Sequence, residues 1–144
     1  MGYMDFHGHR QGSAKPYSLA VHGADFVLGD HFVLMEMASR DGSDRVLVHP
    51  ALIAMLERVR EHFGAPVSIN SGYRTPRHNR RIGGATESRH KYGMAADIDV
   101  RGHSPREVAD YLATLDPGGL AEYKTFVHCD VSDEDRRWGI NPRR

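Results

Sequence analysis

Ser88-Arg89-His90-Lys91-Tyr92-Gly93-Met94-Ala95-Ala96-Asp97 is the stretch around which the rest of the chain is organised. It places a histidine and a carboxylate seven residues apart, with a glycine and two alanines between them. Zinc binds imidazole nitrogen and carboxylate oxygen, and a catalytic zinc site uses three protein ligands and keeps one position open. The stretch therefore predicts two ligands of a metal site, His90 and Asp97, and a third ligand must come from elsewhere.

The third ligand is predicted to be His128, which lies in a run that alternates between apolar and polar residues, Phe126–Val131. Such alternation is typical of a strand, and it places His128 on one face. The chain has ten histidines in 144 residues, so pairs of His and Asp also arise by chance. From spacing alone, ordinary surface or core histidines remain the alternative interpretation.

Three motifs together resemble the peptidase M15 family of zinc D,D-carboxypeptidases and murein endopeptidases. They are Ser88-x-His90-x-x-Gly93-x-Ala95-x-Asp97, the preceding Ser71-Gly72-Tyr73-Arg74-Thr75-Pro76, and the following Phe126-Val127-His128-x-Asp130-Val131. The resemblance runs roughly from residue 31 to residue 138 and includes Leu47–Pro50, the turn at Gly83–Ala85 and Trp138.

The resemblance implies a zinc site, a substrate and a fold. It implies one zinc ion held by His90, Asp97 and His128, and hydrolysis next to D-amino acids in peptidoglycan stem peptides or cross-links. The enzyme would be a carboxypeptidase or an endolysin-like endopeptidase with the fold of the hedgehog signalling domain. Substrate contacts are implied for the following residues: Arg74, Ser88, Tyr73 and Trp138.

Arg74 follows a predicted strand, Val67–Ser71, and is expected to project into a cleft. The planar guanidinium matches a carboxylate through two parallel hydrogen bonds. In the family, the matching arginine is linked to the free carboxylate or a peptide carbonyl of the substrate, which implies a catalytic and binding role for Arg74. A surface salt bridge is the alternative.

The general base is the point at which this sequence departs from the family. Many relatives carry Glu or Asp three residues before the last histidine ligand, where this chain has Thr125. Two carboxylates are candidates in its place: Asp130, on the same strand face as His128, and Glu122, in the segment before that strand. We favour Asp130, with the alternative that it orients an imidazole without transferring protons. If neither acts as a base, the chain is instead a catalytically inactive zinc-containing binding module of the same fold, recognising cell wall or protein.

The composition restricts the partners. Nineteen basic and nineteen acidic residues give a net charge of zero, so nucleic acid and anionic membranes are not expected as partners, and a monomer is expected. The first thirty residues show no signal-peptide pattern. Action on the cell wall therefore implies a cytoplasmic protein released by lysis, as for a phage or prophage endolysin, or export through a leader absent from this sequence. The single cysteine, Cys129, excludes an intrachain disulfide and is expected to be buried.

The local patterns predict a single α+β domain with helices packed on an antiparallel sheet. The M15 resemblance implies that this domain is of the hedgehog/DD-peptidase type. One helix is predicted from Pro50 to the stop at Gly64, and another after the capping box that Ser104 begins. Residues 31–144 form the predicted peptidase-like domain. Residues 1–30 are predicted to be an N-terminal arm or edge segment, with residues 1–15 loose.

Overall fold

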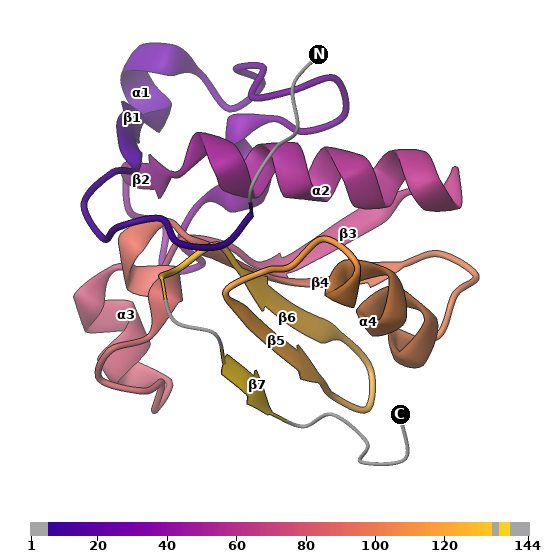
Figure 1. Cartoon of the computed structure of the whole chain (residues 1–144). Helices are drawn as coiled ribbons and strands as arrows, with labels where there is room; N and C mark the ends of the chain where they lie inside the picture. The colour runs from indigo at the N-terminus through magenta and orange to yellow at the C-terminus, as the bar shows by residue number, and fades with distance from the viewer. Residues whose placement is uncertain (1–5, 134–135, 139–144) are drawn as a thin grey trace.

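The computed structural model describes residues 6–133 and 136–138 (Figure 1). Its longest helix, α2 (Pro50–Phe63), begins and ends where the sequence predicts. The ring of His49 accepts the hydrogen bond of the Ala51 amide at 3.0 Å, Pro50 occupies the first turn, and Gly64 ends the helix with φ +59°. The apolar stripe of α2 is buried, so this helix is a packing element of the core.

A five-stranded sheet forms the centre of the molecule, in the order β3-β4-β6-β5-β7. The strands are β3 (Val67–Ser71), β4 (Ala95–Val100), β5 (Gly119–Glu122), β6 (Val127–Asp130) and β7 (Arg136–Trp138). All neighbours are antiparallel except β5 and β7, which are parallel. The α+β prediction is confirmed, and β7 is the departure from a purely antiparallel sheet.

Strand alternation separates the core from the site. Ile98 on β4 lies opposite Val127 on β6, and both are fully buried in the core. Their neighbours Asp97 and His128 lie opposite each other and point to the other face, because successive side chains of a strand alternate. Helix α4 (Pro105–Ala113), which Ser104 and Glu107 cap as predicted, packs against β4, β5 and β6.

Two short helical segments lie between β3 and β4 along the chain. Helix α3 (Pro76–Arg81) is capped by Thr75, whose hydroxyl accepts from the His78 amide at 3.1 Å. The 3-10 helix η2 (Arg89–Tyr92) ends at Gly93, which has φ +70° and packs against the backbone of Leu47. A side chain at Gly93 would be strained and would collide with Leu47, so glycine is required there.

The N-terminal region contributes a strand and a buried side chain. Strand β1 (Lys15–Ser18) pairs with β2 (Arg45–Val48) in a separate two-stranded sheet, and α1 (Leu19–His22) and the 3-10 helix η1 (Leu34–Met37) lie between these two strands along the chain. Residues 6–14, here called the N-terminal arm, include Phe6, which is only 1% exposed and belongs to the core. The described helices are all too short or too polar to cross a membrane.

Candidate metal centre

His90 is fixed by the short helix η2 and by a backbone carbonyl. The Ser88 hydroxyl accepts from the His90 amide at 3.3 Å and caps this helix. The ring is 3% exposed, and its Nδ1 lies 2.7 Å from the carbonyl oxygen of Gly72. Nε2 therefore faces the opposite way, toward Asp97.

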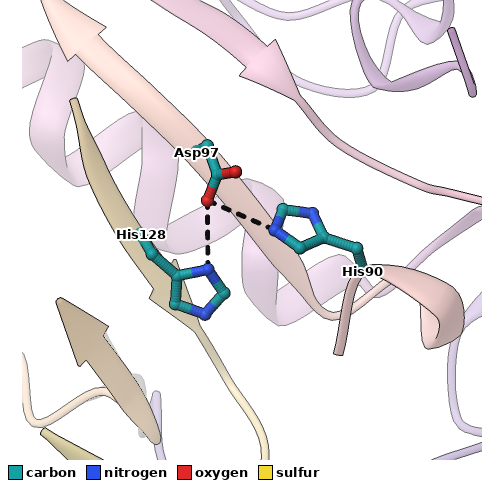
Figure 2. A group of neighbouring side chains, drawn as sticks. All are labelled: His90, Asp97 and His128. Atoms are coloured by element: carbon teal, nitrogen blue, oxygen red, sulfur yellow. Dashed lines mark hydrogen bonds and ion pairs between the residues drawn. The ribbon is translucent and has the colours of Figure 1, made fainter. Parts of the chain in front are cut away.

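Asp97 and His128 come from the facing strands β4 and β6 and complete the cluster (Figure 2). Asp97 Oδ1 lies 3.2 Å from His90 Nε2 and 3.0 Å from His128 Nδ1. One ligand atom from each residue lies within 4.8 Å of the other two, and all three residues are buried. The structure thus brings together the three metal ligands that the sequence predicts.

The donor set fits zinc, because each imidazole turns one ring nitrogen toward the centre while its other nitrogen lies next to an oxygen that can accept its proton. The Gly72 carbonyl accepts from His90 Nδ1, and the Asp130 carboxylate accepts from His128 Nε2 at 2.8 Å. A neutral ring protonated at those atoms keeps a lone pair on His90 Nε2 and on His128 Nδ1, the two nitrogens that face Asp97. Two imidazoles and one carboxylate are a usual set for a catalytic zinc ion.

The electrostatics also favour a cation. Burial alone would raise the pKa of Asp97, but the bonds with His128 and His90 outweigh burial and hold the pKa of that carboxyl well below its usual range. Burial lowers the pKa of His90, which keeps its ring neutral as metal ligation requires. Burial alone would also lower the pKa of His128, but Asp130 and Asp97 raise it, so a metal ion at this ring competes with its protonation. The centre therefore concentrates negative charge on Asp97 beneath a cavity.

The cluster opens into a cavity of about 630 Å³. Its lining includes the three candidate ligands together with Arg74, Ala85, Glu87, Ser88, Arg89, Tyr123 and Phe126. A cavity of this size suits a peptide segment of a few residues.

Arg74 joins the cluster to the cavity wall. Its guanidinium donates to Ser71 Oγ at 3.1 Å, to Asn79 Oδ1 at 3.2 Å and to Asp97 Oδ2 at 3.4 Å. Burial lowers the pKa of Arg74 from its very high ordinary value, yet Asp97 opposes the shift, and arginine stays protonated. Arg74 thus lines the cavity, and it also forms a largely buried ion pair with Asp97, a candidate ligand.

Comparison with known proteins identifies the family. A sequence profile described as peptidase M15 matches residues 28–130, which is more than half of the chain. The chain belongs to the peptidase M15 family. A relative, the zinc D-Ala-D-Ala carboxypeptidase of Streptomyces albus G, is 43% identical over 51 residues, which are 33% of this chain and 20% of the relative. The alignment thus spans about a fifth of that relative's length.

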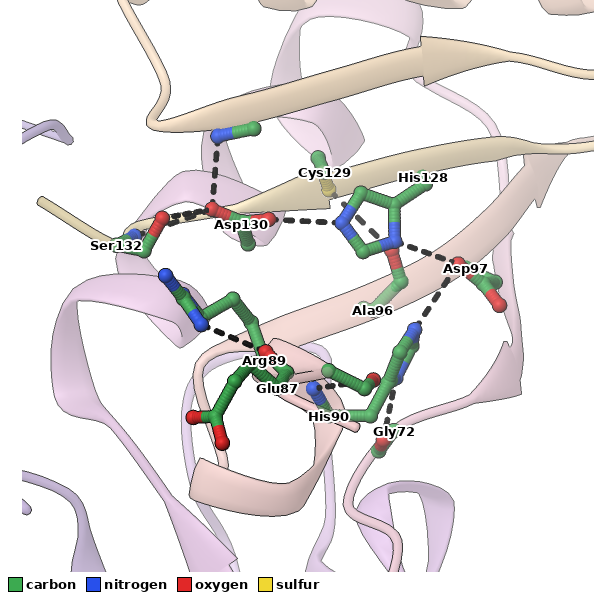
Figure 3. Close-up of polar contacts among 12 residues, drawn as sticks. Gly72, Glu87, Arg89, His90, Ala96, Asp97, His128, Cys129, Asp130 and Ser132 are labelled. Carbon is green, nitrogen blue, oxygen red and sulfur yellow. Dashed lines mark hydrogen bonds and ion pairs between the residues drawn. The ribbon is translucent and has the colours of Figure 1, made fainter. Parts of the chain in front are cut away.

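Asp130, the favoured base of this M15 domain, is placed behind His128 and away from the cavity (Figure 3). It is fully buried, and its Oδ2 lies 2.8 Å from His128 Nε2. Its Oδ1 accepts from the Gly119 amide at 2.7 Å and from the Ser132 amide and hydroxyl at 3.1 Å and 2.7 Å. This geometry favours the alternative role, orientation of an imidazole, and the imidazole is that of His128.

Glu122, the second candidate base, is not brought to the centre. It is the last residue of β5 and lies opposite Val127, so its side chain points to the face of the sheet away from His128. Its carboxylate accepts from Arg106 Nε of α4 at 3.3 Å. Thr125 is exposed and lines a different cavity, beside Ile98 and Asp99.

The predicted substrate contacts divide into three groups. Arg74 and Ser88 line the cavity, and the Ser88 hydroxyl also caps η2. Tyr73 does not line it: the residue is 4% exposed and belongs to the core, and its amide donates to the Met37 carbonyl at 2.9 Å. That burial argues against substrate contact by Tyr73. The side chain of Trp138 lies outside the described part of the structure.

The predicted site lacks five residues of the cavity wall: Ala85, Glu87, Arg89, Tyr123 and Phe126. The rings of Tyr123 and Phe126 stack at 4.6 Å between centroids across the turn from β5 to β6. The Tyr-x-x-Phe spacing directly before the last ligand strand was the available signal. Glu87 accepts from the Tyr92 hydroxyl at 3.0 Å, and its carboxylate is turned away from the three ligands in Figure 3.

Proposed function

We propose that this chain is a zinc-dependent peptidase that hydrolyses amide bonds next to D-amino acids in peptidoglycan stem peptides or cross-links. The observation that carries the proposal is the cluster of His90, Asp97 and His128, whose metal-facing atoms lie within 4.8 Å at the base of a peptide-sized cavity. Membership of the peptidase M15 family supports the reaction class. The name of the Streptomyces relative supports a D-Ala-D-Ala type of substrate.

In the proposed mechanism, the three ligands hold one zinc ion, which supplies Lewis-acid chemistry for polarising a carbonyl and activating water. Arg74 binds a substrate carboxylate or carbonyl oxygen with further N–H groups of its guanidinium, which has five donors in all. Asp130 keeps the proton of His128 on Nε2, so that Nδ1 remains a ligand. The stacked rings of Tyr123 and Phe126 form an apolar wall that excludes water from one side of the bound peptide.

The alternative function is a zinc-containing binding module of the same fold without turnover. One observation favours it: among residues 6–133, the only carboxylates lining the cavity are Asp97 and Glu87. Asp97 is a candidate ligand, and the Glu87 carboxylate is turned away from the centre. The residues described thus place no carboxylate in the usual position of a general base.

Release of products from purified muropeptides, with and without a metal chelator, separates the two functions. A peptidase releases free D-alanine or splits cross-linked dimers, loses activity with chelator, and regains it with zinc. His128→Ala should abolish release, whereas His103→Ala, a matched change outside the site, should not. Zinc binding without any release from either substrate would establish the binding module. The product also decides between carboxypeptidase and endopeptidase.

We propose action on the cell wall as a monomer, with peptidoglycan stem peptides as the partner. Light scattering of the zinc-loaded protein measures the oligomeric state, and sedimentation with isolated cell walls measures the association with the wall.

A further inference from the structure

We propose that Ser132 and the N-terminal arm position the zinc ligand His128 through Asp130, so that zinc affinity depends on a segment outside the cavity. This inference rests on the proposed zinc function. It assigns a role to residues that neither touch the ligand atoms nor line the cavity.

The carboxylate of Asp130 lies between Ser132 and His128 (Figure 3). Asp130 Oδ1 receives three donors, and two of them come from one residue, Ser132. These bonds fix the rotation of the carboxylate and thereby aim Oδ2 at His128 Nε2. Because Asp130 and Ser132 are fully buried, water cannot easily replace a lost donor. The loss of one bond to Oδ1 therefore also changes the geometry of the bond between Oδ2 and His128.

The N-terminal arm holds the segment that contains Ser132. The arm lies along this segment, where the Gly8 amide donates to the Ser132 carbonyl at 3.1 Å and the His9 amide donates to the Val131 carbonyl at 3.2 Å. His9 and Ser132 form a parallel bridge. Phe6, buried to 1% exposure in the core, anchors the arm.

Gly118 also packs closely against Ser132. A Cβ on Gly118 would collide with the backbone and hydroxyl of Ser132, so this residue is enclosed between Gly118 and the arm. The Val131 amide donates to the carbonyl of Met94 at 3.1 Å, which ties the same segment to the start of β4. If the arm leaves, Ser132 loses the contacts with Gly8 and His9, and the donors to Asp130 become mobile.

Ser132→Ala removes the hydroxyl donor and keeps the amide donor, whereas Ser132→Thr keeps both. We expect Ser132→Ala to weaken zinc binding by about 3–30-fold, somewhat less than the direct loss of a residue bonded to a ligand. Ser132→Thr should remain within about threefold of the unaltered protein, on the same grounds. Removal of residues 1–10 should weaken binding at least as much as Ser132→Ala, and Ser68→Ala, an exposed serine on β3, is the matched control.

Zinc affinity is measured by competition with a chromophoric chelator, beside the melting temperature of the zinc-free proteins. A purely structural role predicts a lower melting temperature with zinc affinity unchanged among the folded variants, and that result overturns the inference. If the truncated protein does not fold, the comparison of Ser132→Ala with Ser132→Thr decides. Failure of the unaltered protein to bind zinc refutes the metal site itself. Zinc binding without hydrolysis refutes only the peptidase, and the ranking of affinities still tests the positioning role.

Discussion

Replacing Asp130 by asparagine tests how the zinc ligand His128 is prepared. In the structure, Oδ1 accepts from three donors, while Oδ2 lies 2.8 Å from His128 Nε2. Asparagine has a single oxygen, which is expected to stay with the three donors and to turn its NH₂ group toward His128. Two donors then oppose each other unless the ring moves its proton from Nε2 to Nδ1.

A proton on His128 Nδ1 occupies the lone pair that faces Asp97, which is the lone pair needed by zinc. We therefore expect Asp130→Asn to weaken zinc binding by about 10–100-fold, the usual effect of changing a residue that orients a ligand. That corresponds to about 1.4–2.8 kcal/mol of binding free energy. Chelator competition measures the affinity, and turnover is measured at saturating zinc.

The outcome that would contradict this explanation is specific. If Asp130→Asn keeps its zinc affinity within about twofold while the rate falls by about 10²–10⁴, the carboxylate transfers protons as a general base. Asp99→Asn is the matched control, because Asp99 lies on β4 next to the cluster but lines a different cavity. It should change neither quantity.

Four further changes test the site and the fold. His90→Ala should lose nearly all bound zinc, and stoichiometric zinc in that variant by metal analysis would contradict the ligand assignment. Arg74→Ala should lower turnover and, because it also removes a partner of a ligand carboxylate, weaken zinc binding, whereas a loss of thermal stability alone would show a structural role. Glu122→Gln should leave turnover unchanged, since this carboxylate lies on the face of the sheet away from His128. A hundredfold fall in turnover would show instead that Glu122 reaches the metal centre. Burial alone would raise the pKa of Asp41, but hydrogen bonds from Thr75, Ser39 and Ser43 hold that pKa well below its usual range. Stability from this carboxylate is therefore complete above about pH 4, its unfolded value, and is lost as pH falls toward the folded pKa. Acid titration of zinc-free Asp41→Asn should show a shallower loss of stability than the unaltered protein, and identical slopes would exclude the contribution.

The elements with strong local signals were predictable. The helix from Pro50 has proline at its start, a periodic apolar stripe and glycine at its end, and the capping box at Ser104 is equally local. The M15 resemblance supplied the three candidate ligands, which the structure brings together. Burial of Cys129 followed from strand alternation, and this residue is fully buried.

The positions of the remaining carboxylates depend on contacts between distant segments. Whether Asp130 meets water or His128 depends on donors from Gly119 and Ser132, which no local pattern reveals. Glu122 falls on the wrong face because the register of β5 with β6 sets it opposite Val127, and a shift of one residue would reverse that face. The order of the N-terminal arm likewise comes from burial of Phe6 in a core built by later residues.

The glycines at 118 and 119 make the space in which Asp130 and Ser132 meet. A Cβ on Gly119 would collide with the Asp130 carboxylate, and one on Gly118 would collide with Ser132. Even alanine, the smallest substitution, should therefore be tolerated poorly at both positions, although neither carries a reactive group. A complete mutational scan would record two intolerant sites at the start of β5, and a redesign of this segment for stability must leave both positions without a side chain.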